Sequence, residues 1–334
     1  MATEIESLLE YVLKYGAHEL IVTEGSVASV RFAGRVGDVP DTTVIPFGTL
    51  TQFLGALEGE SGTFIGGPWL NFRWRVKYFR EALGYAAIFH PLLNDVPAFT
   101  ELGKPSSLDN LLGLSSGLVI FSGPVCSGKT VTATSFVSTM CQSGILRFCN
   151  LDAGHELPIM TGDSLMLQNT VGTTSEKIEQ GLRSGTDLFW MGDFEESTLI
   201  PLLRAAEAGA LVVLNVTAGN AVGVIDKFLS ASTPQNCDLV RMMLASVLKA
   251  VVVQRLLSSP ETEAAVPAWE ILFNTQNVAS LIRSGEHFKL PSIMAASASE
   301  GMLLMDDSLV ELVRTGYVTT EGAIRYVSNR ARLV

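Results

Sequence analysis

Residues 123–130 read Gly-Pro-Val-Cys-Ser-Gly-Lys-Thr and satisfy the phosphate-binding pattern G-x-x-x-x-G-K-[ST]. An apolar run at residues 117–122, typical of a buried strand, precedes the pattern, and a helical stretch from Lys129 to Met140 follows it. In such a loop, successive backbone N–H groups and the positive end of the helix surround a di- or triphosphate. Lys129 would neutralise the β- and γ-phosphate oxygens, and the Thr130 hydroxyl would hold Mg²⁺. A chance match is the alternative, but the flanking strand and helix favour a nucleoside triphosphate site.

The expected ligand of this loop is ATP, with Mg²⁺ bound through the nucleotide. The residues that we expect to contact the nucleotide are Gly123, Pro124, Cys126, Ser127, Gly128, Lys129, Thr130 and Val131.

Hydrolysis needs more than a phosphate loop. A carboxylate must position Mg²⁺, another must orient the attacking water, and a cation usually offsets charge in the transition state. Two aspartates follow predicted strands: Asp152 comes after residues 146–151, and Asp193 comes after residues 188–192. Both fit the first two roles, and Asp193 together with Thr130 is the expected metal site. The alternative for each aspartate is a structural role, because Asp is common where strands end.

The elements that would position these residues change in character along the chain. An amphipathic helix at residues 5–13 and strands at residues 19–22, 29–32, 71–78 and 84–89 predict a small α+β module over residues 1–100. Residues 101–107 contain enough Gly, Pro and Ser to form a linker. From residue 108 to 274, apolar runs alternate with helical segments, which is typical of a parallel sheet buried on both faces. Residues 275–334 are predicted to be helical.

Composition narrows the class of protein. The 334 residues are 47% hydrophobic and 17% charged, which excludes general disorder. The net charge of −11 and the lack of a Lys/Arg-rich block argue against nucleic acid as a partner. No transmembrane segment is expected, because the most apolar stretch, residues 205–217, is broken by Glu207 and Asn215. The four cysteines show no zinc-ligand spacing and are predicted to be small buried residues of a reducing compartment.

Several further segments resemble the secretion and pilus motor ATPases, and within them the PilT-like retraction group. Residues 123–130 look like that family's Walker A loop, residues 150–157 fall where it has an acidic Asp box, and residues 189–196 occupy the place of its Walker B segment. Residues 205–212 are similar to its Ala-Ala-Glu-Thr-Gly-His-Leu-Val motif. Residues 278–285 and 301–306 match the retraction group's C-terminal signatures. The resemblance spans nearly the whole chain.

The departures from the family pattern concern hydrolysis. The glutamates of the Asp box and of Walker B are replaced by Asp152 and Asp193, which reach roughly 1.3 Å less. Because a misplacement of about 1 Å can lower a rate on the order of 100-fold, turnover is expected to be slow. Glu156 keeps a third acidic position of the Asp box, so the expected catalytic residues are Asp152, Glu156 and Asp193. The substituted positions of the Asp and His boxes are Ala153, Ala210 and Thr217. Glu195 and Glu196 fall where the family's Walker B segment ends in Arg and Asp, which reverses one charge.

The resemblance also implies an assembly. In this family, arginines of a neighbouring subunit reach the γ-phosphate, and the candidates here are Arg73, Arg75 and Arg80; an exposed strand face is the alternative role for them. His90 falls where the family usually has a further arginine. Family members form hexameric rings, so we expect a homo- or hetero-hexamer. The expected partner is an inner-membrane platform protein of the pilus or secretion machine, and the expected location is the cytoplasm, including its periphery at the inner membrane.

The fold expected from these observations is α/β: an N-terminal α+β (PAS-like) module, followed by a RecA-like P-loop ATPase core with a helical C-terminal portion. Three functions stay open. The first is a motor or accessory motor that hydrolyses ATP to ADP and phosphate. The second is a nucleotide-binding structural or regulatory subunit, catalytically impaired, that acts with an active paralogue. The third is an unrelated P-loop kinase or GTPase, against which the lack of an N-K-x-D motif argues.

Overall fold

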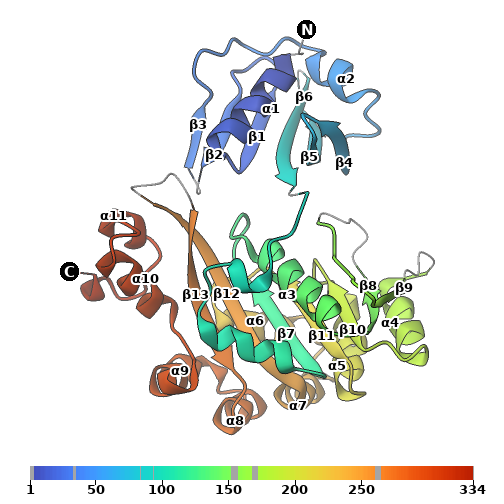
Figure 1. The fold of residues 1–334 in the computed structure, drawn as a ribbon, viewed down its shortest axis with the longest axis vertical. Coiled ribbons are helices and arrows are strands. Elements are labelled where there is room, and N and C mark those ends of the chain that lie inside the picture. The colour runs from blue at the N-terminus through green and yellow to red at the C-terminus, as the bar shows by residue number, and fades with distance from the viewer. Residues whose placement is uncertain are drawn as a thin grey trace. The chain divides into compact units, whose positions relative to one another are not determined.

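The computed structural model describes residues 4–32, 35–82, 84–92, 94–151, 157–167, 172–259 and 265–333. The chain divides into two compact units, the first built on Met1–Asp95 and the second on most of the chain from Val96 onward (Figure 1). The division predicted from the sequence, into residues 1–100, 101–107, 108–274 and 275–334, is finer than these two units and remains a prediction. No described helix combines the length and the apolar composition that a bilayer crossing requires.

The first unit is a six-stranded sheet in the order β3-β2-β1-β6-β5-β4, whose described pairings are antiparallel. Its helices are α1 (Glu4–Tyr15) and α2 (Thr49–Leu54). Its strands are β1 (Glu19–Thr23), β2 (Ser29–Phe32), β3 (Arg35–Asp38), β4 (Ser61–Trp69), β5 (Phe72–Arg80) and β6 (Tyr85–Leu92). The apolar face of α1 packs with alternate residues of these strands, among them Leu20, Trp74 and Phe89, in one buried cluster. The helix and strands predicted for this region are confirmed, whereas β3, β4 and α2 were not predicted.

The second unit contains a seven-stranded sheet in the order β13-β12-β7-β11-β10-β8-β9. Its strands are β7 (Gly117–Ser122), β8 (Arg147–Asn150), β9 (Leu165–Leu167), β10 (Leu188–Met191), β11 (Leu211–Val216), β12 (Leu248–Ser258) and β13 (Ala265–Phe273). The pairs from β12 through β7, β11, β10 and β8 to β9 are parallel.

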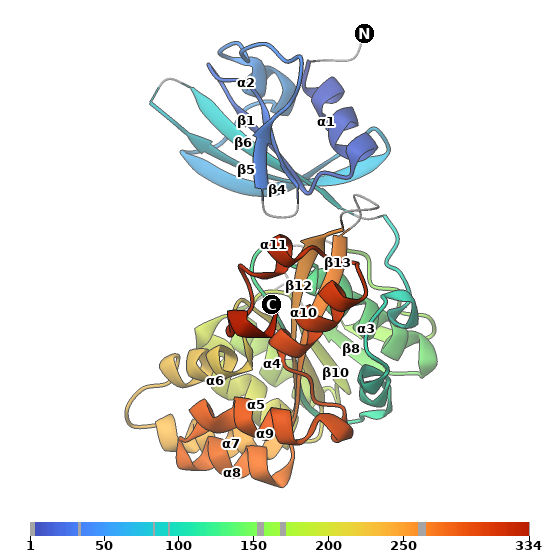
Figure 2. The same cartoon turned by 90° about the vertical axis from the view of Figure 1, so that its left-hand side faces the viewer.

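Helices cover both faces of this sheet. The helices are α3 (Lys129–Ser143), α4 (Thr174–Arg183), α5 (Leu199–Glu207), α6 (Ala221–Ser230), α7 (Cys237–Val247), α8 (Gln276–Ser284), α9 (Leu290–Ala296), α10 (Met305–Arg314) and α11 (Thr320–Ala323). Short 3₁₀ segments are η1 (Phe99–Glu101), η2 (Ser106–Gly113), η3 (Glu196–Thr198), η4 (His287–Lys289), η5 (Ala298–Glu300) and η6 (Arg330–Arg332). Figure 2 shows α5, α7, α8 and α9 beside one another on one side of the unit.

Strand β7 separates two apolar clusters because every one of its residues is buried. Leu118 and Ile120 belong to the cluster that includes α5, α6 and α7. Val119 and Phe121 point to the opposite face and pack in the cluster that includes α3. The continuous apolar run at residues 117–122 therefore reflects burial on both faces, as predicted from the sequence.

The cysteines of the second unit correct one prediction. Cys141 and Cys149 are buried, and burial raises the pKa of each thiol to about 11, so both are protonated at neutral pH. Cys126 and Cys237 are only partly buried, and the prediction of burial was wrong for them. Cys126 lies in the phosphate loop and Cys237 begins α7, and neither place is in the apolar interior.

Glu270 of β13 joins the sheet to two helices. This side chain is 7% exposed, and its carboxylate accepts a hydrogen bond of 2.6 Å from the backbone N–H of Ala221, the first residue of α6. Burial raises the pKa of Glu270 from 4.5, and the N–H groups of Ala221 and Met305 oppose that shift. Arg255 also lowers the pKa, and Asp306 raises it.

We expect Glu270→Gln to change how stability depends on pH. Because the folded-state pKa is raised, the protonated acid contributes stability that is fully present below the unfolded pKa and is lost as pH rises through the folded pKa. Glutamine is neutral at every pH, so the free energy of unfolding of the variant should rise relative to wild type as pH increases above about 4.5. Urea unfolding at a series of pH values measures this difference, and a difference independent of pH would contradict the prediction.

Candidate nucleotide-binding site

The loop between β7 and α3 has the backbone that a phosphate site requires. Gly123, Cys126 and Gly128 have φ values of 152°, 61° and 79°, so the chain turns sharply where the apolar strand ends. A Cβ on Gly123 would lie 2.4 Å from the backbone oxygen of Gln254 and 2.4 Å from Ser127 Oγ. The glycine is therefore required both by its conformation and by the close approach of β12.

The N-terminus of α3 lacks the side-chain groups that usually satisfy a helix start. Its N-cap residue is Gly128, which has no side chain to cap the helix, and no acidic residue lies in its first turn. In contrast, α4 begins with a capping box formed by Thr173 and Glu176. A glycine N-cap, together with the helix dipole, favours an anion at the start of α3. Lys129 Nζ, at the same place, donates a hydrogen bond of 3.2 Å to the loop oxygen of Pro124.

Two buried polar atoms beside the loop fit a bound nucleotide and its metal. Ser127 is 2% exposed and Asn215 is 1% exposed. Ser127 Oγ and Asn215 Oδ1 find no hydrogen-bond partner among the described residues. Buried polar groups are seldom left unpaired, so these two atoms indicate that further groups belong at this site. Hydroxyl and amide oxygens also suit Mg²⁺, because the ion takes oxygen ligands and keeps waters that can donate hydrogen bonds to such oxygens.

Strand β12 holds α3 in place. Thr132 Oγ1 donates a hydrogen bond of 2.6 Å to Gln254 Oε1, and both side chains are buried. A Cβ on Gly128 would lie 2.9 Å from Gln254 Nε2. Gln254 therefore contacts both the phosphate loop and the first turns of the helix that carries Lys129 and Thr130.

The strand order brings the predicted Walker B residue to the same edge of the sheet as the loop. Strand β11 lies between β7 and β10, and all three are parallel, so their carboxyl ends share one edge. Asp193 follows β10 after Gly192, and its side chain is exposed. The predicted Asp-box residues Asp152 and Glu156 lie outside the described residues, so Asp193 alone of the three predicted catalytic acids has a described position.

The side chain of Glu195, which replaces an arginine of the family pattern, lies at the start of helix α4. Thr174 Oγ1 donates a hydrogen bond of 3.4 Å to Glu195 Oε1, and Thr174 is the first residue of α4. A carboxylate is favoured at this position because the N-terminal end of a helix carries positive partial charge. The reversed charge at residue 195 is thus accommodated locally.

The three arginine candidates do not all share a face of the first unit's sheet. Arg73 and Arg75 alternate along β5 with the buried Trp74 and Val76, so the arginines lie on the face opposite the apolar cluster. Arg80 has the other parity and lies at the end of the strand, on the face of Trp74. Arg73 and Arg75 are therefore brought together, and Arg80 is not.

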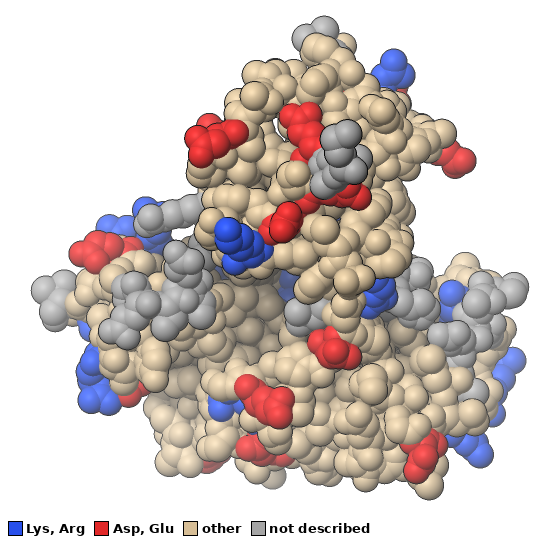
Figure 3. All heavy atoms as spheres, turned by 45° about the horizontal axis from the view of Figure 1, so that its top comes forward, with Lys and Arg blue, Asp and Glu red and all other residues tan. Residues whose placement is uncertain are grey.

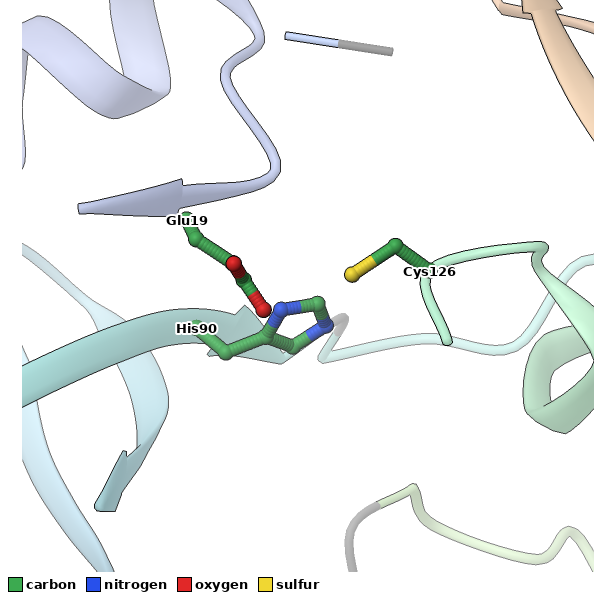
Figure 4. Close-up of side chains that lie close together, drawn as sticks. All are labelled: Glu19, His90 and Cys126. Carbon is green, nitrogen blue, oxygen red and sulfur yellow. The ribbon is translucent and has the colours of Figure 1, made fainter. Parts of the chain in front are cut away.

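Arg75 belongs to a polar row that crosses the sheet. It pairs with His90 of β6, and Glu19 of β1 pairs with Arg31 of β2, to which it forms an ion pair of 2.8 Å. Figure 4 shows the side chains of Glu19 and His90 next to each other on neighbouring strands; Cys126, also drawn there, lies on the loop of the second unit. A basic position of the family pattern is thus occupied by His90 within a row of mixed charge.

Known proteins are similar to this chain in sequence and in fold. Residues 99–296, more than half of the chain, match the family described as Type II/IV secretion system protein. The chain belongs to this family. This secretion-family chain is 26% identical over 340 residues to the type IV pilus ATPase PilU of Pseudomonas aeruginosa, an alignment that covers 98% of the chain and 89% of PilU. It is 27% identical to the retraction ATPase PilT of the same organism, over 75% of the chain and 74% of PilT.

Two solved structures have the fold of this secretion-family chain. The pilus retraction motor PilT with bound ADP has a TM-score of 0.77 and 23% identity, and covers 99% of this chain and 98% of that one. The ATPase DotB of Legionella pneumophila has a TM-score of 0.79 and 14% identity, with coverage of 96% and 94%. The family and fold class predicted from the sequence are confirmed.

Asn215 and Gln254 are site residues that the sequence analysis missed as such. In the sequence, Asn215 stands out only as a break in an apolar stretch, and Gln254 only as part of a segment that resembles a Gln-Arg-Leu strand of the family. A signal for Asn215 was present, because a lone amide at the end of a buried strand needs a partner. The sequence alone does not show which strand lies next to the phosphate loop.

Proposed function

We propose that this chain is an ATP-binding motor or accessory motor subunit of a type IV pilus or type II secretion machine, with weakened ATP hydrolysis. The observation that carries the proposal is the phosphate loop between buried β7 and α3, whose N-cap is Gly128, with Lys129 and Thr130 in the order of the binding pattern. The relatives named as pilus ATPases and the ADP-bound neighbour of the same fold support ATP as the ligand.

In the proposed mechanism, different residues of the second unit bind the phosphates, hold the metal and orient the attacking water. The loop amides and Lys129 bind the phosphates, while Thr130 and Asp193 would hold Mg²⁺, which offsets negative charge on the phosphates. Asp152 and Glu156 are the proposed residues that orient the attacking water. Because Asp193 and Asp152 stand where the family has glutamates, we propose that hydrolysis is slow.

The assembly that we propose is a homo- or hetero-hexamer, in which a neighbouring subunit supplies a cation to the γ-phosphate. Arg73 and Arg75, which share a face of β5, are the proposed donors, and the position of Arg80 makes it the weaker candidate. The proposed partner is a platform protein of the inner membrane, and the proposed location is the cytoplasm beside it. The described Lys and Arg side chains are scattered over the face drawn in Figure 3.

ATP turnover by the assembled protein tests the proposal. We expect a slow rate in wild type that exceeds the rate of Lys129→Ala. That variant lacks the ammonium group that neutralises negative charge on the β- and γ-phosphates. Asp193→Glu should raise the rate by roughly 10- to 100-fold, since it restores the reach of the family's residue. Phosphate release gives both rates.

Two outcomes decide between the motor and its alternative. A wild-type rate equal to that of Lys129→Ala, with ATP binding retained in wild type, would favour a nucleotide-binding regulatory subunit that acts with an active paralogue. If wild type bound neither ATP nor ADP, both functions would be excluded.

A further inference from the structure

Asn215 is a buried amide that touches the residue expected to hold the metal. It lies in β11, is 1% exposed, and pairs in register with Phe121 of β7, next to the strand's end. Its Nδ2 donates a hydrogen bond of 3.4 Å to Thr130 Oγ1. Its Oδ1 has no partner among the described residues. The carboxamide thus has its Nδ2 on Thr130, while no described residue hydrogen-bonds to its Oδ1.

An unused amide oxygen in the interior is unfavourable by itself. Leaving a buried acceptor unsatisfied costs about 1–3 kcal/mol, whereas an apolar side chain of similar size would avoid that loss. Strand β11 is otherwise fully buried and apolar, so the amide does not serve the packing of the strand. An amide in an otherwise apolar buried strand indicates that Oδ1 accepts a hydrogen bond when nucleotide and metal are bound.

We propose that Asn215 Oδ1 accepts a hydrogen bond from a water molecule bound to the Mg²⁺ that Thr130 would hold. The inference rests on the proposed function, since it needs a nucleotide in the loop. Mg²⁺ keeps several waters when it binds proteins, and its charge makes those waters strong donors. The contact between Nδ2 and Thr130 Oγ1 places the carboxamide beside the expected metal ligand, so Asn215 is a positioning residue for the hydrated ion.

The test is the gain in ADP affinity that Mg²⁺ produces, measured by calorimetry with Mg²⁺ and then with EDTA. ADP lacks the γ-phosphate, so the measurement isolates the metal. We expect Asn215→Leu to reduce the gain about tenfold, because hydrogen-bonding partners around metal ligands typically contribute 10- to 100-fold to metal affinity. ADP affinity in EDTA should stay at the wild-type value, which also shows that the loop is folded.

Two further variants keep the test decisive if Asn215→Leu folds poorly. Asn215→Asp keeps an acceptor, so the Mg²⁺-dependent gain should equal or exceed that of wild type, while affinity in EDTA falls through repulsion of the phosphates. Asn274→Leu is the matched control: its amide Nδ2 donates to the backbone oxygens of Ala245 and Leu248, so the variant should keep the wild-type gain.

The results separate this inference from the proposed function. If wild type does not bind ADP, the proposed function fails. If wild type binds ADP and Asn215→Leu keeps the full gain, or Asn215→Asp loses it, the metal role of Asn215 is excluded and the proposed function stands. A loss confined to a non-hydrolysable ATP analogue, with the ADP gain intact, would assign Asn215 to the γ-phosphate and also overturn the inference.

Discussion

Gly123→Ala is expected to weaken ADP binding roughly 100-fold, through backbone strain and displacement of the loop. The φ of 152° disfavours a side chain, and the new Cβ would lie 2.4 Å from the backbone oxygen of Gln254. A backbone atom in a buried strand cannot move aside as a flexible side chain can. The loop must therefore shift, and its amides lose their alignment with the phosphates. Calorimetric titration with ADP measures the loss.

Gly144→Ala is the matched control for this prediction. Gly144 follows α3 with an extended φ of −154°, and a Cβ there would meet nothing within 4 Å. Its ADP affinity should equal that of wild type. Near-wild-type ADP affinity in Gly123→Ala would show that phosphate binding does not depend on the alignment of the loop's backbone amides.

Phe136→Ala should lower the free energy of unfolding of the second unit by about 3–5 kcal/mol. Phe136 is fully buried in α3, and its ring lies 5.3 Å from that of Phe99 and 5.6 Å from that of Phe121. Truncation removes contacts between the helix that carries Lys129 and the strand that leads into the loop. Urea unfolding followed by far-ultraviolet circular dichroism reports on this helix-rich unit.

Phe288→Ala serves as the comparison because the same side chain is removed from an exposed position. Phe288 is 66% exposed, so its truncation should change the free energy of unfolding by no more than about 0.5 kcal/mol. Equal effects of the two substitutions would contradict the assignment of Phe136 to the core.

Much of the second unit's fold could be predicted from the sequence because its strands are buried on both faces. The runs at residues 117–122 and 188–192 match β7 and β10 closely, since both strands are buried along their whole length. The first unit was harder. Strand β4 contains Gly62, Gly66, Gly67 and Pro68, which usually interrupt strands, and it forms because an edge strand tolerates them.

The candidate site could be predicted only where its residues are adjacent in the chain. The loop and the start of α3 form one continuous segment, so the pattern at residues 123–130 located them. Asn215 meets Thr130 across 85 residues, and Gln254 meets Thr132 across 122 residues. Those contacts depend on the order of strands in the sheet, which local patterns do not encode.

The alternation of side chains along β5 limits how this sheet can present charge. In β5, side chains at odd-numbered positions point to one face of the sheet and those at even-numbered positions to the other. Arg73 and Arg75 therefore share a face, and Arg80 lies on the opposite one. Of the three candidates, a surface lying flat against the face opposite the apolar cluster meets Arg73 and Arg75 but not Arg80. A single inserted residue upstream within the strand would exchange the two sides, and the pair would then point into the apolar interior.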